Sequence, residues 1–205
     1  MEHNLYWILL ASVCVISFFV GSIPFAVIVS KLMGLADPRS YGSQNPGATN
    51  VLRSGNKLAA ALTLLGDCAK GLVVVLVARA LGFDLPVVMS MALAVFFGHV
   101  FSVFLRFKGG KGVATALGVL LGLSPWLGGA VLLTWLLVFG LFRYSSLAAL
   151  TAAVLAPVYA GLLINWTVAM WLVVVSAMLV WRHQSNIKKL CRGEEGKFGQ
   201  KSSSK

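Results

Sequence analysis

The chain has 205 residues, of which 59% are hydrophobic and only 11% are charged, and its mean hydropathy is +0.88. This composition excludes an ordinary soluble domain, in which about a quarter of the residues are charged. The net charge of +11 does not point to a nucleic-acid partner, because cytoplasmic loops of membrane proteins are themselves enriched in Lys and Arg. The sequence therefore predicts an integral membrane protein.

Apolar runs long enough to form membrane-spanning helices follow one another along the chain. The first, residues 4–30, lacks a basic start and is too long for a cleaved signal, so we expect a retained span. The others are expected at 56–81, 86–105, 112–123, 126–142, 146–164 and 166–182. The 112–123 run makes only about 18 Å of helix, so it crosses incompletely or forms a re-entrant pair with its neighbour. We expect an all-α bundle of about seven transmembrane helices.

Polar residues gather in three segments, 41–57, 106–112 and 181–195. When the loops are assigned alternately to the two membrane faces, every Lys and Arg except Lys70 and Arg79 falls on the side of these segments. The Lys and Arg excess predicts that this side is cytoplasmic, with the N terminus outside and the C terminus inside. We expect residues 1–195 to form one transmembrane domain, followed by a polar basic tail, 196–205, near the lipid headgroups.

The first polar segment contains GSQNPGATNVLR, in which Gly, Pro and Asn residues precede a helix. Glycines let the backbone approach a ligand closely, and successive free N–H groups bind anions. Arg53 adds a guanidinium, which binds phosphate in a bidentate manner. The segment is therefore a candidate phosphate site. The residues alone leave Ser43 either as a group that orients a substrate or as a nucleophile.

The second polar segment, RFKGGKGVAT, carries three glycines and the lysines Lys108 and Lys111 directly before a helical run. It is not a Walker A loop, which needs GxxxxGK followed by Ser or Thr. We expect Gly109, Gly110 and Gly112 to expose backbone amides, and amides with lysines at a helix start favour a phosphate ligand.

In the third polar segment, His183 and Asn186 are three residues apart. On a helix that continues past the last span they would share a face and address one substrate. A histidine that titrates near neutrality suits hydrogen bonding to a hydroxyl or phosphate, or proton transfer. Glu195 has basic neighbours and is expected to be structural.

Ionisable residues inside the spans need partners. Asp67 and Lys70 are spaced for a salt bridge within the second span, which we favour over contact with a substrate. His99 is expected to be packed and hydrogen-bonded. An HxxxxD acyltransferase dyad is absent, and scattered histidines with few carboxylates predict neither a metal site nor a cofactor.

GSQNPGATNVLR, KGGKGVAT and HQSNIKKLCRGEE, in this order among seven spans, closely resemble the bacterial acyl-phosphate:glycerol-3-phosphate acyltransferase (PlsY) family. The resemblance covers the chain up to about Glu195. It implies transfer of an acyl group from acyl phosphate to the sn-1 hydroxyl of glycerol 3-phosphate, giving lysophosphatidic acid and phosphate. It also implies a location in the bacterial inner membrane and no obligate protein partner, with the enzyme that makes acyl phosphate as a candidate partner.

The resemblance also assigns roles to individual residues. The catalytic residues it implies are Ser43, Arg53, Lys111, His183 and Asn186, with Gly109, Gly110 and Gly112 in the acyl-phosphate loop and Glu195 as a structural residue. From the residues themselves we expect the substrate-binding set to include Asn45, Gly47, Ala48, Thr49, Asn50 and Lys108, and we expect Asp67 and Lys70 to be structural. One departure is Gln44, where a glycine is common in the family. The neighbouring pattern is intact, so we expect the chemistry to be unchanged.

A transporter or lipid flippase for phosphorylated compounds is the alternative interpretation, because it would also need anion sites in a helical bundle. Transporters commonly contain inverted repeats with polar residues deep within their spans. This sequence shows no such symmetry, and most of its polar residues are expected at one face. The acyltransferase is therefore favoured.

Overall fold

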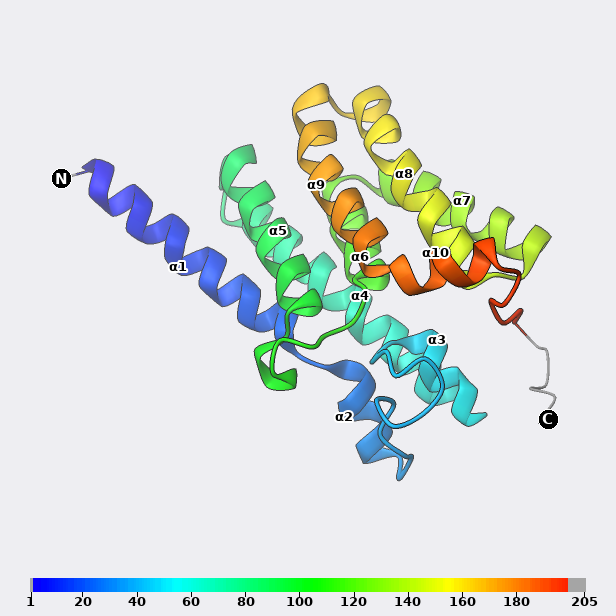
Figure 1. The fold of residues 1–205 in the computed structure, drawn as a ribbon. Coiled ribbons are helices and arrows are strands. Elements are labelled where there is room, and N and C mark those ends of the chain that lie inside the picture. Colours follow the sequence, from blue (N-terminus) through cyan, green and yellow to red (C-terminus); the bar gives the residue numbers. More distant parts are fainter. Residues whose placement is uncertain (1, 199–205) are drawn as a thin grey trace. The chain divides into compact units, whose positions relative to one another are not determined.

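The computed structural model describes residues 2–198, and all regular secondary structure in this range is helical (Figure 1). The chain forms two compact units, one up to Gly128 and one from Gly129. The first unit contains α1 (Glu2–Ser22), α2 (Phe25–Leu32), α3 (Ala48–Val51), α4 (Lys57–Ala80), α5 (Leu85–Val100) and α6 (Val113–Leu123), with 3-10 turns η1 (Leu52–Ser54) and η2 (Val103–Leu105). α7 (Pro125–Phe142) continues into the second unit, which contains α8 (Ser145–Leu163), α9 (Trp166–Arg182) and α10 (Gln184–Cys191).

Each of the seven predicted segments coincides with helical structure. In the described part of the chain, five segments are long and apolar enough to cross a membrane, and a sixth is obtained if α9 and α10 form one span. α6 has only 11 residues, in agreement with the short run in the sequence. Length and composition thus support five or six crossings, and the predicted count of seven is not confirmed.

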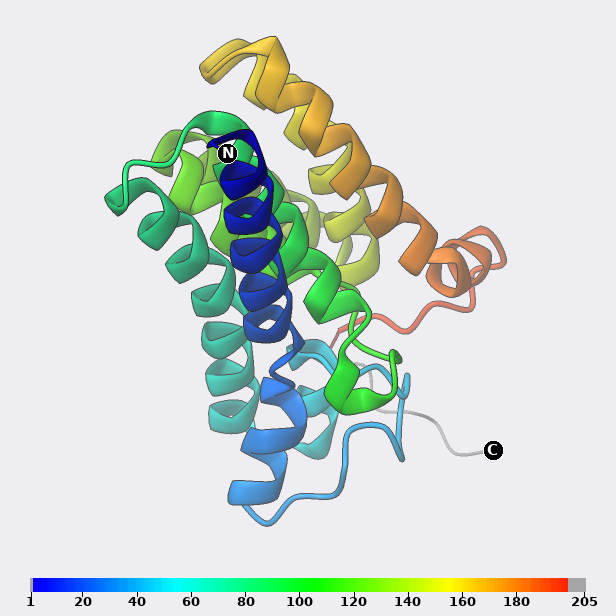
Figure 2. The same cartoon turned by 90° about the vertical axis from the view of Figure 1, so that its left-hand side faces the viewer.

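The first predicted span is interrupted between α1 and α2, where Pro24 precedes the second helix (Figure 2). A proline has no N–H to donate, so carbonyls at such a break need other partners. The Ser22 carbonyl accepts a hydrogen bond from Ser102 Oγ at 2.5 Å, and the Ile23 carbonyl accepts one from Lys70 Nζ at 3.0 Å. Side chains that are distant in the sequence therefore supply hydrogen bonds to the carbonyls at the break.

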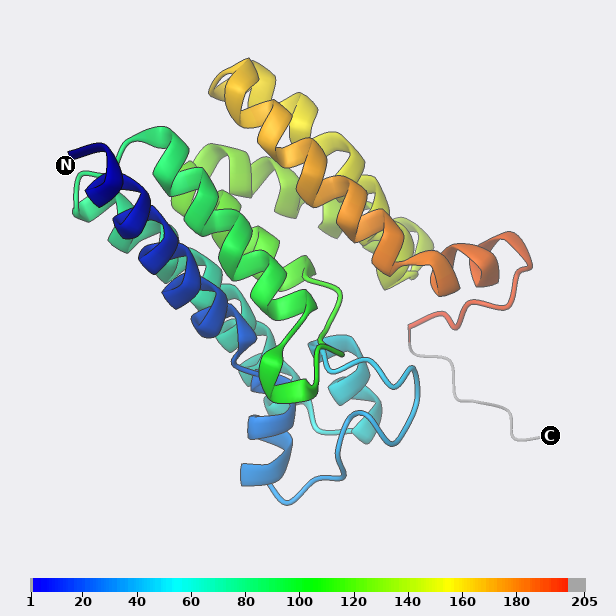
Figure 3. The same cartoon turned by 60° about the vertical axis from the view of Figure 1, so that its left-hand side comes forward.

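The first unit is held together by α1 packing on α5, and by α4 packing on both α5 and α6 (Figure 3). A core of buried valines lies between α4 and α5, including Val74, Val75 and Val95. α1 and α5 approach closely at Gly98, where an added Cβ would meet the carbonyl of Phe18. Small residues permit such approaches in membrane helices.

In the second unit α8 packs on α9, and Ser176 Oγ donates to the Ala153 carbonyl at 2.6 Å. α10 bends away from α9 by 60°. The beginning of the predicted tail packs on this unit, because Phe198 N donates to the Arg143 carbonyl at 2.8 Å. The rest of that tail, residues 199–205, lies outside the described residues.

Candidate active site

The loop of the first polar segment is built around Asn50, which is buried. Its Oδ1 accepts a hydrogen bond from the Ser43 N–H at 2.9 Å, and its Nδ2 donates to the carbonyls of Pro38 at 2.6 Å and Tyr41 at 3.2 Å. The whole amide is therefore occupied by the loop backbone. The substrate-binding role expected for Asn50 stays a prediction; in the structure its side chain fixes the position of Ser43.

Arg53, in η1, lies against the same loop. A Cβ added at Gly42, whose φ is +59°, would meet Asn50 Oδ1 and the side chain of Arg53. Only a glycine fits here, because both the backbone conformation and the space exclude a side chain. Arg53 is exposed and has no carboxylate partner among residues 4–198. Its guanidinium thus lies beside Gly42 with its charge available to an anion.

A second arginine near this loop is engaged differently. Arg39 donates from Nε and Nη2 to the carboxylate of Asp37, with Nη2 at 2.6 Å from Oδ2. The side-chain hydrogen bond from Arg39 holds the pKa of Asp37 below its ordinary value. Arg39 is therefore already paired, in contrast to Arg53.

The glycine-rich loop, residues 106–112, differs from the prediction in one respect. The N–H groups of Gly109 and Gly110 do not point outward but donate to the carbonyls of Val100 and His99, both at 3.1 Å. The end of α5 thereby anchors the loop. Because these two amides are used internally, the candidate anion-binding groups of the loop are its cations and the first-turn amides of α6. Lys108 is exposed and Lys111 is half-buried.

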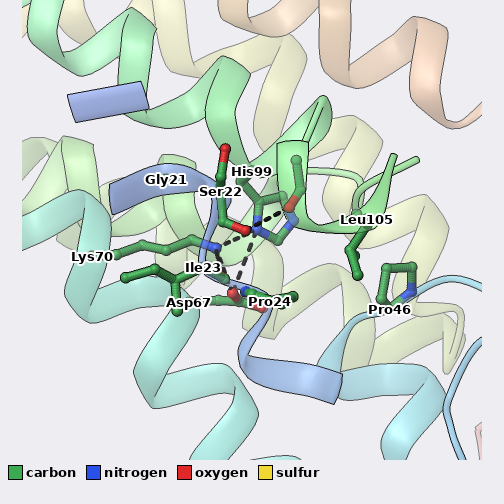
Figure 4. A pocket seen from close by; sticks show the side chains of 11 residues that line it. Gly21, Ser22, Ile23, Pro24, Pro46, Asp67, Lys70, His99 and Leu105 are labelled. Carbon is green, nitrogen blue, oxygen red and sulfur yellow. Dashed lines mark hydrogen bonds and ion pairs between the residues drawn. The ribbon is translucent and has the colours of Figure 1, made fainter. Parts of the chain in front are cut away.

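The two loops meet at a small cavity, which Pro46 lines from the first loop and Gly110 from the glycine-rich loop (Figure 4). Asp67, Lys70 and His99 line the same cavity. The first two polar segments, which the sequence places on one side of the membrane, therefore meet at one cavity within the first unit.

The predicted pairing of Asp67 and Lys70 is present, with Lys70 Nζ 2.8 Å from Asp67 Oδ1. Lys70 Nζ is also 2.8 Å from His99 Nδ1. Sequence reasoning found no partner for His99, since the two residues lie on different helices. The only available signal was that each was an ionisable residue inside an apolar run.

The third polar segment lies in the second unit. His183 is buried at the bend between α9 and α10, and its Nδ1 is 2.7 Å from the Leu179 carbonyl. The helix therefore does not continue straight through His183 and Asn186, as the spacing argument assumed. Asn186 Nδ2 donates to Glu195 Oε1 at 2.7 Å, and Ser146 Oγ donates to the same oxygen at 2.6 Å. Glu195 thus ties α10 to α8.

Metal-ligand types do not cluster in the described part of the chain: no group of three or more His, Cys, Asp or Glu side chains is placed to hold an ion. The cysteines Cys14, Cys68 and Cys191 form no disulfide there. The groups assembled around the loops are instead cations and hydrogen-bond donors, which suit an anion.

Gln44 adopts a left-handed conformation, with φ of +56°, which explains why a glycine would be natural at this position. Because a left-handed residue costs about 1 kcal/mol and an added glycine costs a similar amount of unfolded-state entropy, Gln44→Gly is expected to be near neutral. Gln44→Val should destabilise by about 1–2 kcal/mol, because a β-branched side chain tolerates this conformation least. Thermal unfolding in detergent measures both; an unchanged midpoint for Gln44→Val would contradict the strain at this position.

The family model, the curated relatives and the solved structures that match this chain all belong to one family. Residues 11–193 match the family model for glycerol-3-phosphate acyltransferase. Curated glycerol-3-phosphate acyltransferases from Thiobacillus denitrificans and Bordetella pertussis are each 56% identical, covering 92% and 93% of this chain and 96% and 93% of the relatives. The crystal structure of PlsY, an integral membrane glycerol 3-phosphate acyltransferase, in its glycerol 3-phosphate form has a TM-score of 0.87 at 38% identity, covering 93% of this chain and 96% of that one. Its lysophosphatidic acid form has a TM-score of 0.86 at 37% identity, covering 93% and 95%.

Proposed function

Because the chain belongs to the glycerol-3-phosphate acyltransferase family of integral membrane enzymes, we propose that it transfers an acyl group from acyl phosphate to the sn-1 hydroxyl of glycerol 3-phosphate. The products are lysophosphatidic acid and phosphate. The observation that carries the proposal is the meeting of the first loop and the glycine-rich loop at one cavity. Both substrates carry a phosphate, and each loop supplies cations suited to one.

The glycine-rich loop is the proposed site for the phosphate of the acyl donor. Lys108 and Lys111 flank its two central glycines, and the loop leads into the N-terminus of α6. Helix N-termini and lysines both favour a phosphate. The acyl chain would then lie among the apolar helices, in keeping with a donor that enters from the bilayer.

In the proposed reaction the sn-1 oxygen attacks the carbonyl carbon of acyl phosphate. A new ester C–O bond forms, the C–O bond to phosphate breaks, and the hydroxyl proton passes to the departing phosphate. The donor is already activated, so a strong protein base is unnecessary. Arg53 and Lys111 neutralise the phosphates and hold them in position, and positioning with charge neutralisation supplies most of the rate enhancement.

Ser43 is proposed to orient acyl phosphate rather than to form an acyl-enzyme. Its backbone is fixed by Asn50, and His99, the histidine that lines the cavity between the two loops, is buried and contacts Lys70. A serine nucleophile needs an adjacent base. Mass spectrometry of protein quenched during turnover should show unmodified Ser43; a trapped acyl-serine would overturn direct transfer.

His183 and Asn186 are proposed to orient glycerol 3-phosphate. The Leu179 carbonyl accepts from Nδ1 of His183, so a neutral ring presents Nε2 as an acceptor, which suits a substrate hydroxyl. Glu195 fixes the side chain of Asn186, which supports its proposed structural role.

The Lys and Arg distribution supports a multi-pass protein of the bacterial inner membrane whose active site faces the cytoplasm. In this proposal residues 1–195 act as one acyltransferase domain, and the basic tail contacts lipid headgroups. The enzyme that makes acyl phosphate is the proposed source of the donor.

Incubation of purified protein with acyl phosphate and labelled glycerol 3-phosphate tests the function. Lysophosphatidic acid should form without acyl-carrier protein or coenzyme A. Product that appears only with a thioester donor would overturn the donor assignment. Uptake of labelled glycerol 3-phosphate into proteoliposomes without any acylated product would favour a transporter instead.

A further inference from the structure

A buried polar network lies directly under the glycine-rich loop. Lys70 Nζ, on α4, is within hydrogen-bond distance of three groups: Asp67 Oδ1 at 2.8 Å, His99 Nδ1 at 2.8 Å and the Ile23 carbonyl at 3.0 Å. The side chains of Asp67, Lys70 and His99 are 5%, 2% and 8% exposed. An ammonium has three N–H donors, so each one has an acceptor. Lys70 therefore has no donor left for a substrate.

The network fixes the orientation of His99. Because an ammonium only donates, Nδ1 of His99 accepts, and the neutral imidazole carries its proton on Nε2. Nε2 is the ring nitrogen that faces Gly110, since a Cβ added at Gly110 would meet Nε2 first. Figure 4 shows the imidazole of His99 beside Lys70, with a dashed line marking their contact. The imidazole is thus the part of the network that touches the loop.

The two central glycines of the loop meet different obstacles. At Gly110 an added Cβ would meet the imidazole of His99, which is a side chain. At Gly109 an added Cβ would meet the carbonyls of His99 and Val100, which are backbone. A change in the His99 side chain therefore alters the space at Gly110 but not at Gly109.

We propose that His99, held by Lys70 and Asp67, is a positioning residue that fixes the position and orientation of the glycine-rich loop relative to the end of α5. This inference rests on the proposed function, in which that loop binds the phosphate of the acyl donor. Lys70 also holds the Ile23 carbonyl at the break between α1 and α2. The Lys70 ammonium thereby contacts the break in the first span directly and supports the glycine-rich loop through His99.

His99→Asn tests the proposal with little risk to the fold, because an Asn oxygen can replace Nδ1 as acceptor for Lys70 while the rest of the ring is removed. The KM for acyl phosphate is expected to rise about ten-fold, since misplaced binding groups act on the substrate they hold. The KM for glycerol 3-phosphate should stay within about two-fold. Ser90→Ala, on the same helix and away from the loop, is the matched control and should leave both constants unchanged.

A double-mutant cycle then tests the contact itself. In the wild-type background Gly110→Ala should raise the KM for acyl phosphate strongly. In the His99→Asn background the same substitution should raise this KM by a factor that is smaller by about five-fold or more, because the obstructing ring is gone. Gly109→Ala should raise the KM for acyl phosphate by the same factor in both backgrounds. The positioning role is wrong if Gly110→Ala costs the same in both, or if His99→Asn raises both KM values equally.

Wild-type protein assayed in parallel distinguishes a failure of the positioning role from a failure of the proposed function. If the wild-type protein transfers the acyl group but the effects of Gly110→Ala and His99→Asn are additive, the positioning role is wrong and the proposed function stands. Wild-type protein that forms no lysophosphatidic acid overturns the proposed function, and the positioning role falls with it.

Discussion

Arg53→Ala is expected to lower kcat/KM for acyl transfer by about a thousand-fold or more. The Arg53 guanidinium lies beside Gly42 and Asn50 and has no carboxylate partner among residues 4–198. Two charge-assisted hydrogen bonds to a phosphate contribute about 4 kcal/mol, which corresponds to a factor of about a thousand. Initial rates of lysophosphatidic acid formation over a range of both substrate concentrations measure the loss.

Arg39→Ala is the matched control, because Arg39 lies near the same loop but is 46% exposed and already paired with Asp37. Exposed ion pairs contribute little to stability, so transfer should stay within about two-fold of wild type. Arg53→Lys should retain part of the activity, since it keeps the charge but loses the bidentate geometry. Near-normal turnover of both substrates by Arg53→Ala would show that Arg53 is not the phosphate clamp.

The helices were largely predictable, because unbroken apolar runs and residues such as Asp84 and Asn165 mark their limits. Asp84 Oδ1 accepts from the Val87 N–H and Asn165 Oδ1 from the Val168 N–H, so both residues cap helices. The break at Pro24 was missed. A proline in an apolar run becomes a break only where other groups satisfy the freed carbonyls, and those groups, Lys70 and Ser102, are far away in sequence.

The sequence was enough to predict which residue types make up the candidate site, but not which contacts those residues make. The glycines, Arg53 and the lysines pointed to phosphate because of their chemistry alone. That Asn50 would serve the loop backbone, and that the amides of Gly109 and Gly110 would bind α5, depends on how the chain folds back on itself. The same holds for His183, where a 60° bend replaces the expected continuous helix.

Asp67→Ala is expected to cause the largest loss of stability. Among the described residues, Asp67 supplies the only carboxylate within ion-pair distance of the Lys70 ammonium, which is 2% exposed. Removal of one partner from a buried ion pair costs about 3–5 kcal/mol, because the remaining charge stays desolvated. For a chain of this size this should lower the thermal midpoint by about 10 °C. Unfolding in detergent, followed by intrinsic tryptophan fluorescence, measures the shift.

Replacing both charged partners separates charge burial from loop positioning. Asp67→Leu combined with Lys70→Met leaves no unpaired charge, and apolar residues often replace a buried ion pair at little cost. The double variant should therefore recover at least half of the midpoint lost in Asp67→Ala. Transfer should not recover with it, because His99 Nδ1 has lost the ammonium that fixes its ring under Gly110. A double variant no more stable than Asp67→Ala would show that the uncompensated charge is not the dominant cost.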